Sequence, residues 1–406
     1  MKKLVSSVLA ASMVLSLAAC GSTASTDTAS SEAASEAAST AATTEAAGEG
    51  SGAYTGTPIK IGGIGPVTGG AAIYGQAVKN AEELAVKEIN AANGSDVFEW
   101  KFEDDEHDAE KSVNAYNTLK DWGLQVLAGP VTTTPSIAVA AETANDNLFM
   151  MTPSASAPAV IESGDNVFQI CFTDPNQGVG AADYMAENFA DAKIAIIYRN
   201  DDAYSQGIRD AFVKEAGDKG LSIVYQGTFT LDTSSNFSVQ LAAAQTAGAD
   251  LVFLPIYYQP ASVIFAQAKA MGYAPTFFGV DGMDGILDMP GFDTTLAEGL
   301  VLMTPFCATV ESSKSFVDAY VAAYGTKPNQ FAADAYDGVY IIKAALEQAG
   351  CTADMSNEEI CDALVSAMTS LKFTGLTGTD MTWNAEGQVS KAPTAYVVKD
   401  GQYVEG

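Results

Sequence analysis

The stretch from Gly65 to Gly75, GPVTGGAAIYG, is the first part of the chain whose composition suggests ligand chemistry. It lies between an apolar run at 59–64 and a helical pattern at 77–89, a place where glycine-rich loops often bind phosphate. A Walker loop would need Lys followed by Ser or Thr where Ala71 and Ala72 stand, and no G-x-G-x-x-G can be read. The position of this segment favours a ligand-binding loop, but its residue pattern does not identify the ligand.

Hydrolytic chemistry finds little support in the sequence. His107 is the single histidine of 406 residues, it stands in the acidic run EDDEHDAE, and no G-x-S-x-G is present. A serine or cysteine triad is therefore not expected, whereas paired carboxylates stay open because acidic residues are abundant. No C-x-x-C occurs, and the acidic run is typical of a solvated loop. We expect no enzyme, no metal site and no cofactor.

Short β-rich runs alternate with longer helical patterns from residue 57 onward, which predicts βαβ units and an α/β fold with parallel sheets. Expected strands lie at 59–64, 98–102, 126–128, 148–151, 193–198, 222–225, 250–254, 276–278 and 300–303; expected helices include 109–121, 136–144, 178–189, 205–219 and 261–271. Nine or more strands exceed one comfortable sheet, so we predict two lobes. Ligands bind beyond the carboxyl ends of such strands. The loops GPVTTTPS, TPSASAP, RNDDAYSQG, PIYYQP and GVDGMDG all follow predicted strands, as GPVTGG does.

Eight segments in register resemble the leucine/isoleucine/valine-binding proteins of ABC importers, which have the type I periplasmic-binding fold. They begin with IGGIGPVTGGAAIYGQAVKNAEELAVKEIN and continue through VLAGPVTTTPSIAVA, MMTPSASAP, IAIIYRNDDAYSQG, QAKAMGY, FFGVDG, AYDGVYIIKAAL and WNAEGQVSK. The resemblance covers 57–406 and implies two parallel-sheet lobes joined by three hinge crossings, with one ligand trapped between them. We expect lobe 1 to comprise 57–173 and 306–387, and lobe 2 to comprise 174–305 and 388–406.

The resemblance also implies ligand roles that fit the chemistry of a free amino acid. Thr133, with Thr132 beside it, matches the hydroxyl that binds the carboxylate near a helix N-terminus; an N-cap cluster is the alternative interpretation. Ser156 and the Ser154 carbonyl match the acceptors for the ammonium group, and Asp281 matches its carboxylate, with Asp284 as the second choice.

The side-chain pocket implied by the resemblance is apolar and uncharged. Tyr74, Val131, Tyr257 and Phe331 match its wall, and Tyr204 closes it from the second lobe. A charged ligand side chain would stay unpaired there, so an aliphatic or aromatic one suits the wall better. A sugar receptor would present several Asn, Asp and Arg side chains instead. The predicted role of GPVTGG is to let the ligand reach the strand ends.

The N-terminus predicts export and a lipid anchor. Lys2 and Lys3 precede an apolar run that ends in LAACG, which resembles a bacterial lipobox with Cys20 as the lipidated residue. We expect a signal peptide at 1–19 and a disordered Ser/Thr/Ala/Glu tether at 20–56. A secretory peptide that happens to contain a cysteine is the alternative. The anchor would hold the protein on the outer face of the cell membrane without spanning it, and the long tether favours a Gram-positive surface.

Charge and cysteines complete the sequence-based expectations. The net charge of −30 argues against nucleic acid and against a basic membrane patch. In an exported protein Cys351 and Cys361 are the expected disulfide pair, with buried free thiols as the alternative. We predict a monomeric receptor for an apolar, branched-chain type amino acid that serves an ABC permease and its ATPase. The alternatives are another small ligand (an aromatic or small amino acid, an amide or a sugar) or a sensory role.

Overall fold

The computed structural model describes residues 43–44 and 54–405. The predicted signal peptide at 1–19 and the predicted lipidation site Cys20 lie outside these residues, as does most of the predicted tether. Two parts of that tether are ordered: Thr43–Thr44 forms strand β1, and the Tyr54 amide donates to Asn93 Oδ1 at 2.7 Å. The ordered chain therefore starts before the expected residue 57.

The first sheet contains five parallel strands in the order β3-β2-β4-β5-β6. They are β2 (Ile59–Gly65), β3 (Phe98–Asp104), β4 (Val126–Ala128), β5 (Met150–Thr152) and β6 (Val167–Gln169). The connecting helices are α1 (Ala72–Asn93), α2 (Ala109–Trp122), α3 (Thr133–Asp146) and α4 (Pro158–Ile161). Strands β4 to β6 are buried on both faces because helices cover both sides of a parallel sheet.

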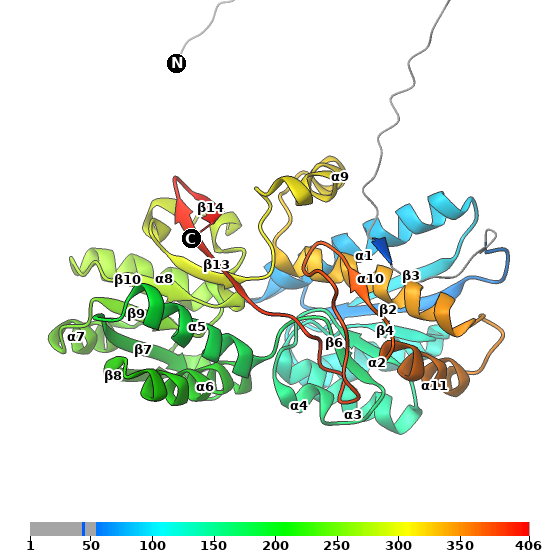
Figure 1. The fold of residues 1–406 in the computed structure, drawn as a ribbon, viewed down its shortest axis with the longest axis horizontal. Coiled ribbons are helices and arrows are strands. Elements are labelled where there is room, and N and C mark those ends of the chain that lie inside the picture. Colours follow the sequence, from blue (N-terminus) through cyan, green and yellow to red (C-terminus); the bar gives the residue numbers. More distant parts are fainter. Residues whose placement is uncertain (1–42, 45–53, 406) are drawn as a thin grey trace, which may run out of the picture. The chain divides into compact units, whose positions relative to one another are not determined.

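The second sheet has seven strands in the order β14-β13-β11-β10-β9-β7-β8. Its parallel strands are β7 (Lys193–Arg199), β8 (Ser222–Phe229), β9 (Leu251–Leu254), β10 (Thr276–Gly279) and β11 (Val301–Thr304). Helix α5 (Asp174–Asn188) precedes β7, and the helices that connect β7 to β10 in the chain are α6 (Ala203–Lys219), α7 (Ser238–Thr246) and α8 (Tyr258–Ala270). Figure 1 shows the first sheet in blue to cyan and most of the second in green.

The second sheet ends in an antiparallel hairpin that the sequence reading did not assign. Strands β13 (Thr394–Lys399) and β14 (Gln402–Glu405) pair with each other, and β13 pairs antiparallel with β11. Asp400 and Gly401 form the turn with φ of 51° and 72°, the positive values that a two-residue hairpin turn needs. The α/β class is confirmed, and this sheet is mixed at its edge.

The chain passes between the two sheets three times. It crosses after β6, crosses back after β11 into α9 (Lys314–Tyr324), α10 (Gln330–Ala349) and α11 (Asn357–Met368), and crosses again before β13. Helix α10 packs along α1 of the first sheet, and β12 (Phe373–Thr374) pairs with β1. The three crossings place the loops at the carboxyl ends of both sets of parallel strands next to each other.

The four described cysteines are free and buried. The disulfide predicted between Cys351 and Cys361 is therefore not formed in this structure. Cys351 follows the glycine that ends α10, and Cys361 lies on α11 at 1 % exposure, so both thiols pack in the apolar core instead. Burial raises the pKa of the Cys361 thiol to about 12. Within the described residues, no helix combines the length and apolarity that a membrane span needs.

Candidate functional site

The GPVTGG loop permits close backbone approach, as predicted. A Cβ atom on Gly75 would lie 2.2 Å from the Pro66 carbonyl oxygen, and one on Gly65 would lie 2.4 Å from Val131 Cγ2. Glycine at these positions lets the loop fold tightly onto the start of α1 and lets Val131 pack against β2. The loop thereby delivers Tyr74, in the first turn of α1, to the carboxyl edge of the sheet.

A small cavity lies at the meeting point of the two sets of loops. Nine of the ten ligand-binding residues predicted from the sequence line it, together with Gly282, which was not predicted; the lining is Tyr74, Val131, Thr132, Thr133, Ser154, Tyr204, Tyr257, Asp281, Gly282 and Phe331. Ser156 is the predicted residue that does not line the cavity. The structure therefore gathers residues that are up to 257 positions apart in the chain.

Aromatic rings from both lobes form the wall of the cavity. Tyr74 lies 4.2 Å from Phe331 and 5.3 Å from Tyr257, measured between ring centroids, and Tyr204 lies 5.0 Å from Tyr257. The Tyr74 hydroxyl donates to the Gly282 carbonyl across the two lobes. These contacts between opposite faces show a closed cleft, with an uncharged wall.

One end of the cavity has the features of an anion site. Helix α3 begins at Thr133, so its first N–H groups have no partner within the helix. The Thr132 hydroxyl does not cap the helix but pairs with His107 Nδ1 at 2.8 Å. The Thr133 hydroxyl is buried and has no hydrogen-bond partner among the described residues. The N-cap interpretation of these threonines is therefore wrong, and a carboxylate would satisfy the unpaired donors.

The other end of the cavity carries a buried carboxylate. Asp281 is 3 % exposed, and its Oδ1 accepts from the Tyr204 hydroxyl at 2.5 Å. Its backbone N–H donates to Gln177 Oε1 at 3.2 Å. Burial raises the pKa of Asp281 to about 7, and the effect is only partly offset by these hydrogen bonds. In the described part of the chain no cationic side chain forms an ion pair with Asp281.

Asp174 is a second buried carboxylate near the cleft that sequence reasoning missed. Its backbone N–H donates to the Ser156 carbonyl at 2.9 Å, which places it between the lobes at the first crossing. Both of its carboxylate oxygens, the Ser156 hydroxyl and Gln177 Nε2 are buried without a hydrogen-bond partner in the described residues. Burial raises the pKa of Asp174 well above its ordinary value, while the neighbouring Ser156 hydroxyl acts in the opposite direction. The helix start TDPNQG was the available signal, but an acidic residue in a first helical turn is common.

Gly282 is the other missed residue. A Cβ at this position would lie 2.5 Å from Tyr204 Oη and 2.9 Å from Tyr257 Cδ1, so a side chain would displace two rings of the wall. By contrast, Asp284, the second choice for the ammonium partner, does not line this cavity. Its carboxylate accepts from the N–H groups of Gln330 at 2.7 Å and Gly285 at 2.9 Å, facing a different pocket.

Comparisons with known proteins agree with this geometry. A family model described as "Periplasmic binding protein" matches residues 58–402. The Leu/Ile/Val-binding protein BraC3 of Rhizobium johnstonii is 31 % identical over 300 residues, 73 % of this chain and 81 % of the relative. The Leu/Ile/Val-binding protein homolog 3 of Brucella melitensis is 30 % identical over 73 % of this chain and 80 % of the relative.

A solved structure extends the comparison to three dimensions. The branched-chain amino acid transporter substrate binding protein LivJ from Streptococcus pneumoniae, in complex with isoleucine, is 28 % identical, with a TM-score of 0.75 over 86 % of this chain and 98 % of that one. The type I periplasmic-binding fold predicted from the sequence is therefore confirmed.

Proposed function

Because the chain belongs to the periplasmic binding protein family, we propose that it captures an apolar amino acid of the branched-chain type and delivers it to an ABC importer. The observation that carries this proposal is the polarity of the cavity. The loops of the first sheet contribute an unpaired helix N-terminus and the Thr133 hydroxyl, and the loops of the second sheet contribute the buried Asp281 carboxylate. A free amino acid supplies an anion and a cation at matching ends.

Each end of the ligand has partners of suitable chemistry. Its carboxylate would accept from the Thr133 hydroxyl and the first N–H groups of α3. Its ammonium would pair with Asp281, with the Ser154 carbonyl as a further acceptor. Ser156 would act indirectly, through its contact with Asp174. The ammonium group would replace the missing cation beside Asp281, which burial alone makes costly to ionise.

The wall selects the ligand side chain. Tyr74, Val131, Tyr257 and Phe331 present carbon surface and no charge, so a charged side chain would lose its hydration without compensation. The named ligands of the relatives, leucine, isoleucine and valine, fit this wall. Closure of the lobes around the ligand is the hinge motion that the three crossings allow.

The remaining features of the receptor follow from the sequence. We propose that residues 1–19 are removed, that Cys20 is lipidated, and that the tether links a monomer to the outer face of a cell membrane of Gram-positive type. The lobes would be 57–173 with 306–387 and 174–305 with 388–406. No catalytic activity is proposed.

The test is a thermal-shift screen of the purified protein against the twenty amino acids, several sugars and aromatic acids. A ligand at a hundred times its dissociation constant stabilises the folded state by about 2.7 kcal/mol. We expect Leu, Ile or Val to raise the melting temperature of the native protein and of the control Asp318→Asn, an exposed acid on α9. We expect no such shift for Asp281→Asn. A response to sugars alone would refute the zwitterion site.

A further inference from the structure

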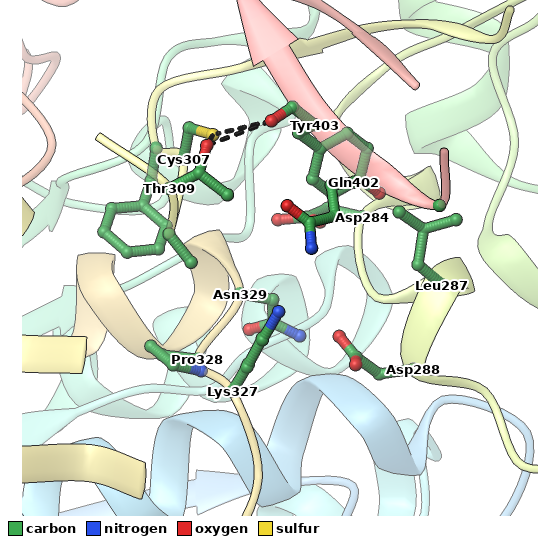
Figure 2. Close-up of a pocket in the computed structure, with 13 residues that line it drawn as sticks. Asp284, Leu287, Asp288, Cys307, Thr309, Lys327, Pro328, Asn329, Gln402 and Tyr403 are labelled. Atoms are coloured by element: carbon green, nitrogen blue, oxygen red, sulfur yellow. Dashed lines mark hydrogen bonds between the residues drawn. The ribbon is translucent and has the colours of Figure 1, made fainter. Parts of the chain in front are cut away.

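A second pocket, partly open to solvent, lies apart from the amino-acid cavity. Four separate segments form it: residues 284–288 after β10, residues 306–309 on the second crossing, residues 327–329 before α10, and the β13–β14 turn at 401–403. Figure 2 shows their side chains around one space. The pocket shares no lining residue with the amino-acid cavity.

The floor of this pocket is polar and buried. Asp284 is 3 % exposed, and each of its carboxylate oxygens accepts only one backbone N–H, from Gln330 or from Gly285. The Tyr403 hydroxyl is buried beside Asp284, and burial together with this carboxylate raises the pKa of the phenol well above its ordinary value. The Tyr403 carbonyl accepts from Thr309 Oγ1 at 3.0 Å, which fixes the turn against the crossing. The Asp284 carboxylate and the adjacent Tyr403 phenol oxygen both have lone pairs that can accept further hydrogen bonds, which favours a cationic donor such as an ammonium group.

The rim of the pocket carries both signs of charge. Asp288 and Lys327 are exposed at its edge, and the described residues place no ion pair between them. Partial desolvation raises the pKa of Asp288, and the nearby Lys327 ammonium group opposes this effect. Between floor and rim, Leu287, Phe306 and Pro328 give carbon surface. A metal ion does not fit, because no cluster of three or more metal-ligating side chains is found in the described part of the chain.

We propose that this pocket is a second small-molecule site, which takes a compound with an ammonium group at one end and a carboxylate at the other. The ammonium group meets Asp284 and the Tyr403 hydroxyl on the floor, and the carboxylate meets Lys327 at the rim. The apolar middle of the pocket suits a short methylene chain between the two groups.

Gln330 links this site to the amino-acid cavity. Its backbone N–H donates to Asp284 Oδ2 at 2.7 Å, and its side-chain Nε2 donates to the Asp281 carbonyl at 3.0 Å. Its Oε1 accepts from Thr304 Oγ1 at 3.0 Å, at the start of the second crossing. Gln330 is 2 % exposed, so it has no alternative partners in water. Occupancy of the second site therefore biases cleft closure, a consequence that rests on the proposed function.

The test is isothermal titration with 4-aminobutanoate, which carries both charges, and with n-butylamine, which carries the ammonium group alone. Each probe is titrated into the native protein saturated with leucine and into Asp281→Asn without leucine. We expect 4-aminobutanoate to bind both proteins, since its site does not include Asp281, with dissociation constants that differ only by the severalfold coupling to leucine. If leucine itself does not bind, the proposed function fails, and the Asp281→Asn titration still decides the second site.

Variants at the second site distinguish the contribution of the floor residues to binding from that of the rim residues. Asp284→Asn and Tyr403→Phe should each weaken both probes, the first by at least tenfold. Lys327→Gln should weaken 4-aminobutanoate about fivefold and leave n-butylamine unchanged, while Lys314→Gln on α9 changes neither. Tyr403→Phe keeps the test valid if Asp284→Asn fails to fold. Absence of binding by both probes, or binding that these variants do not alter, overturns the proposal.

The coupling between the second site and the amino-acid cavity is tested by a separate measurement, the leucine dissociation constant. Saturation with 4-aminobutanoate should change the leucine dissociation constant severalfold in the native protein, and Gln330→Met should remove that change. An unchanged leucine constant in the presence of bound 4-aminobutanoate would refute the coupling.

Discussion

Two aspartates buried in the same hinge region differ in one respect, the presence of a cation. Asp334, on α10, pairs with Lys391 Nζ at 2.5 Å, and both side chains are 2 % exposed. Lys391 also donates to Thr377 Oγ1 at 2.7 Å, so the third crossing is tied to the first lobe. Asp281 is equally buried, but in the described part of the chain its partners are neutral groups such as the Tyr204 phenol, and no cation pairs with it.

This difference separates a structural charge from a functional one. The protein supplies the partner of Asp334, so that pair is complete without a ligand. The partner of Asp281 has to come from outside, which is the property expected of a site that binds an ammonium group. Removing a charge at these two positions should therefore affect different measurements.

The largest expected effect is on stability, from Lys391→Met. This change leaves Asp334 buried without a cation and should lower the free energy of unfolding by about 3–5 kcal/mol. Denaturant unfolding at pH 7 measures it. Lys343→Met is a matched control on α10, because Lys343 pairs with the exposed Glu347 at 2.6 Å and should contribute less than about 1 kcal/mol.

A double variant sharpens this prediction. Asp334→Leu combined with Lys391→Met removes both buried charges and should recover most of the lost stability. If Lys391→Met alone costs no more than the Lys343→Met control, the pair does not anchor the crossing.

Asp281→Asn should show the opposite pattern. The ligand-free protein should be as stable as the native protein or more so, since a buried carboxylate without a cation is removed. Leucine affinity should fall by roughly 3 kcal/mol, more than a hundredfold, because the ammonium group would be desolvated without a charged partner. Calorimetric titration gives the affinity and denaturant unfolding gives the stability. If Asp281→Asn lost stability but kept its leucine affinity, Asp281 would be the structural charge and not the ligand partner.

The sequence predicted the strands better than the ends of the helices. The run at 126–128 matches β4 in full because short apolar runs are buried on both faces. Helix α1 begins at Ala72, five residues before the expected start, because Gly75 continues the helix while packing on Pro66. That close approach depends on tertiary structure and leaves no local sequence signal.

The site could be predicted as a set of residues but not as a network. Tyr74, Thr133 and Asp281 could be predicted because this sequence aligns with a known family. Asp174 could not, because its place beside Ser156 of the other lobe depends on the folded structure. The error over Asp284 has the same origin: it lies only three residues from Asp281, but the turn of the 3₁₀ helix at Asp281–Met283 directs it to the second pocket. Spacing alone cannot resolve which side of a loop a carboxylate faces.

The pH dependence of leucine binding tests the charge state of Asp281. Burial raises its pKa in the closed, ligand-free protein to about 7, above the unfolded value, so the stability of that state falls as pH rises from about 4 to about 7 and is unaffected by this group at higher pH. The ligand's ammonium group favours the ionised form. Leucine affinity should therefore reach its maximum above pH 7. Below pH 7 it should fall by up to about tenfold per pH unit, which amounts to a loss of roughly 2–3 kcal/mol of binding free energy between pH 7 and pH 5.

Two variants identify the carboxyl group that causes this pH dependence. Asp281→Asn should make the weak residual binding independent of pH in this window, and Asp174→Asn should keep the dependence, although Asp174 also has a raised pKa and faces Asp281. Titration calorimetry in buffers of different ionisation enthalpy should show proton release on binding at pH 6. A flat profile in the native protein would mean that Asp281 is already ionised before leucine binds.

Tyr204→Phe should have the smallest effect of the series. The Tyr204 hydroxyl donates to Asp281 Oδ1 and accepts from the Gly282 N–H at 2.9 Å, so it orients the carboxylate without replacing the missing cation. Loss of a hydrogen bond to a charged group should weaken leucine binding by about 1–2 kcal/mol, well below the effect of Asp281→Asn. Tyr225→Phe, on β8 away from the cavity, is the matched control. Because the phenol stabilises the ionised carboxyl, its removal should also move the pH profile of leucine binding upward, and a Tyr204→Phe profile that stays at the native position would show that the phenol only fills space.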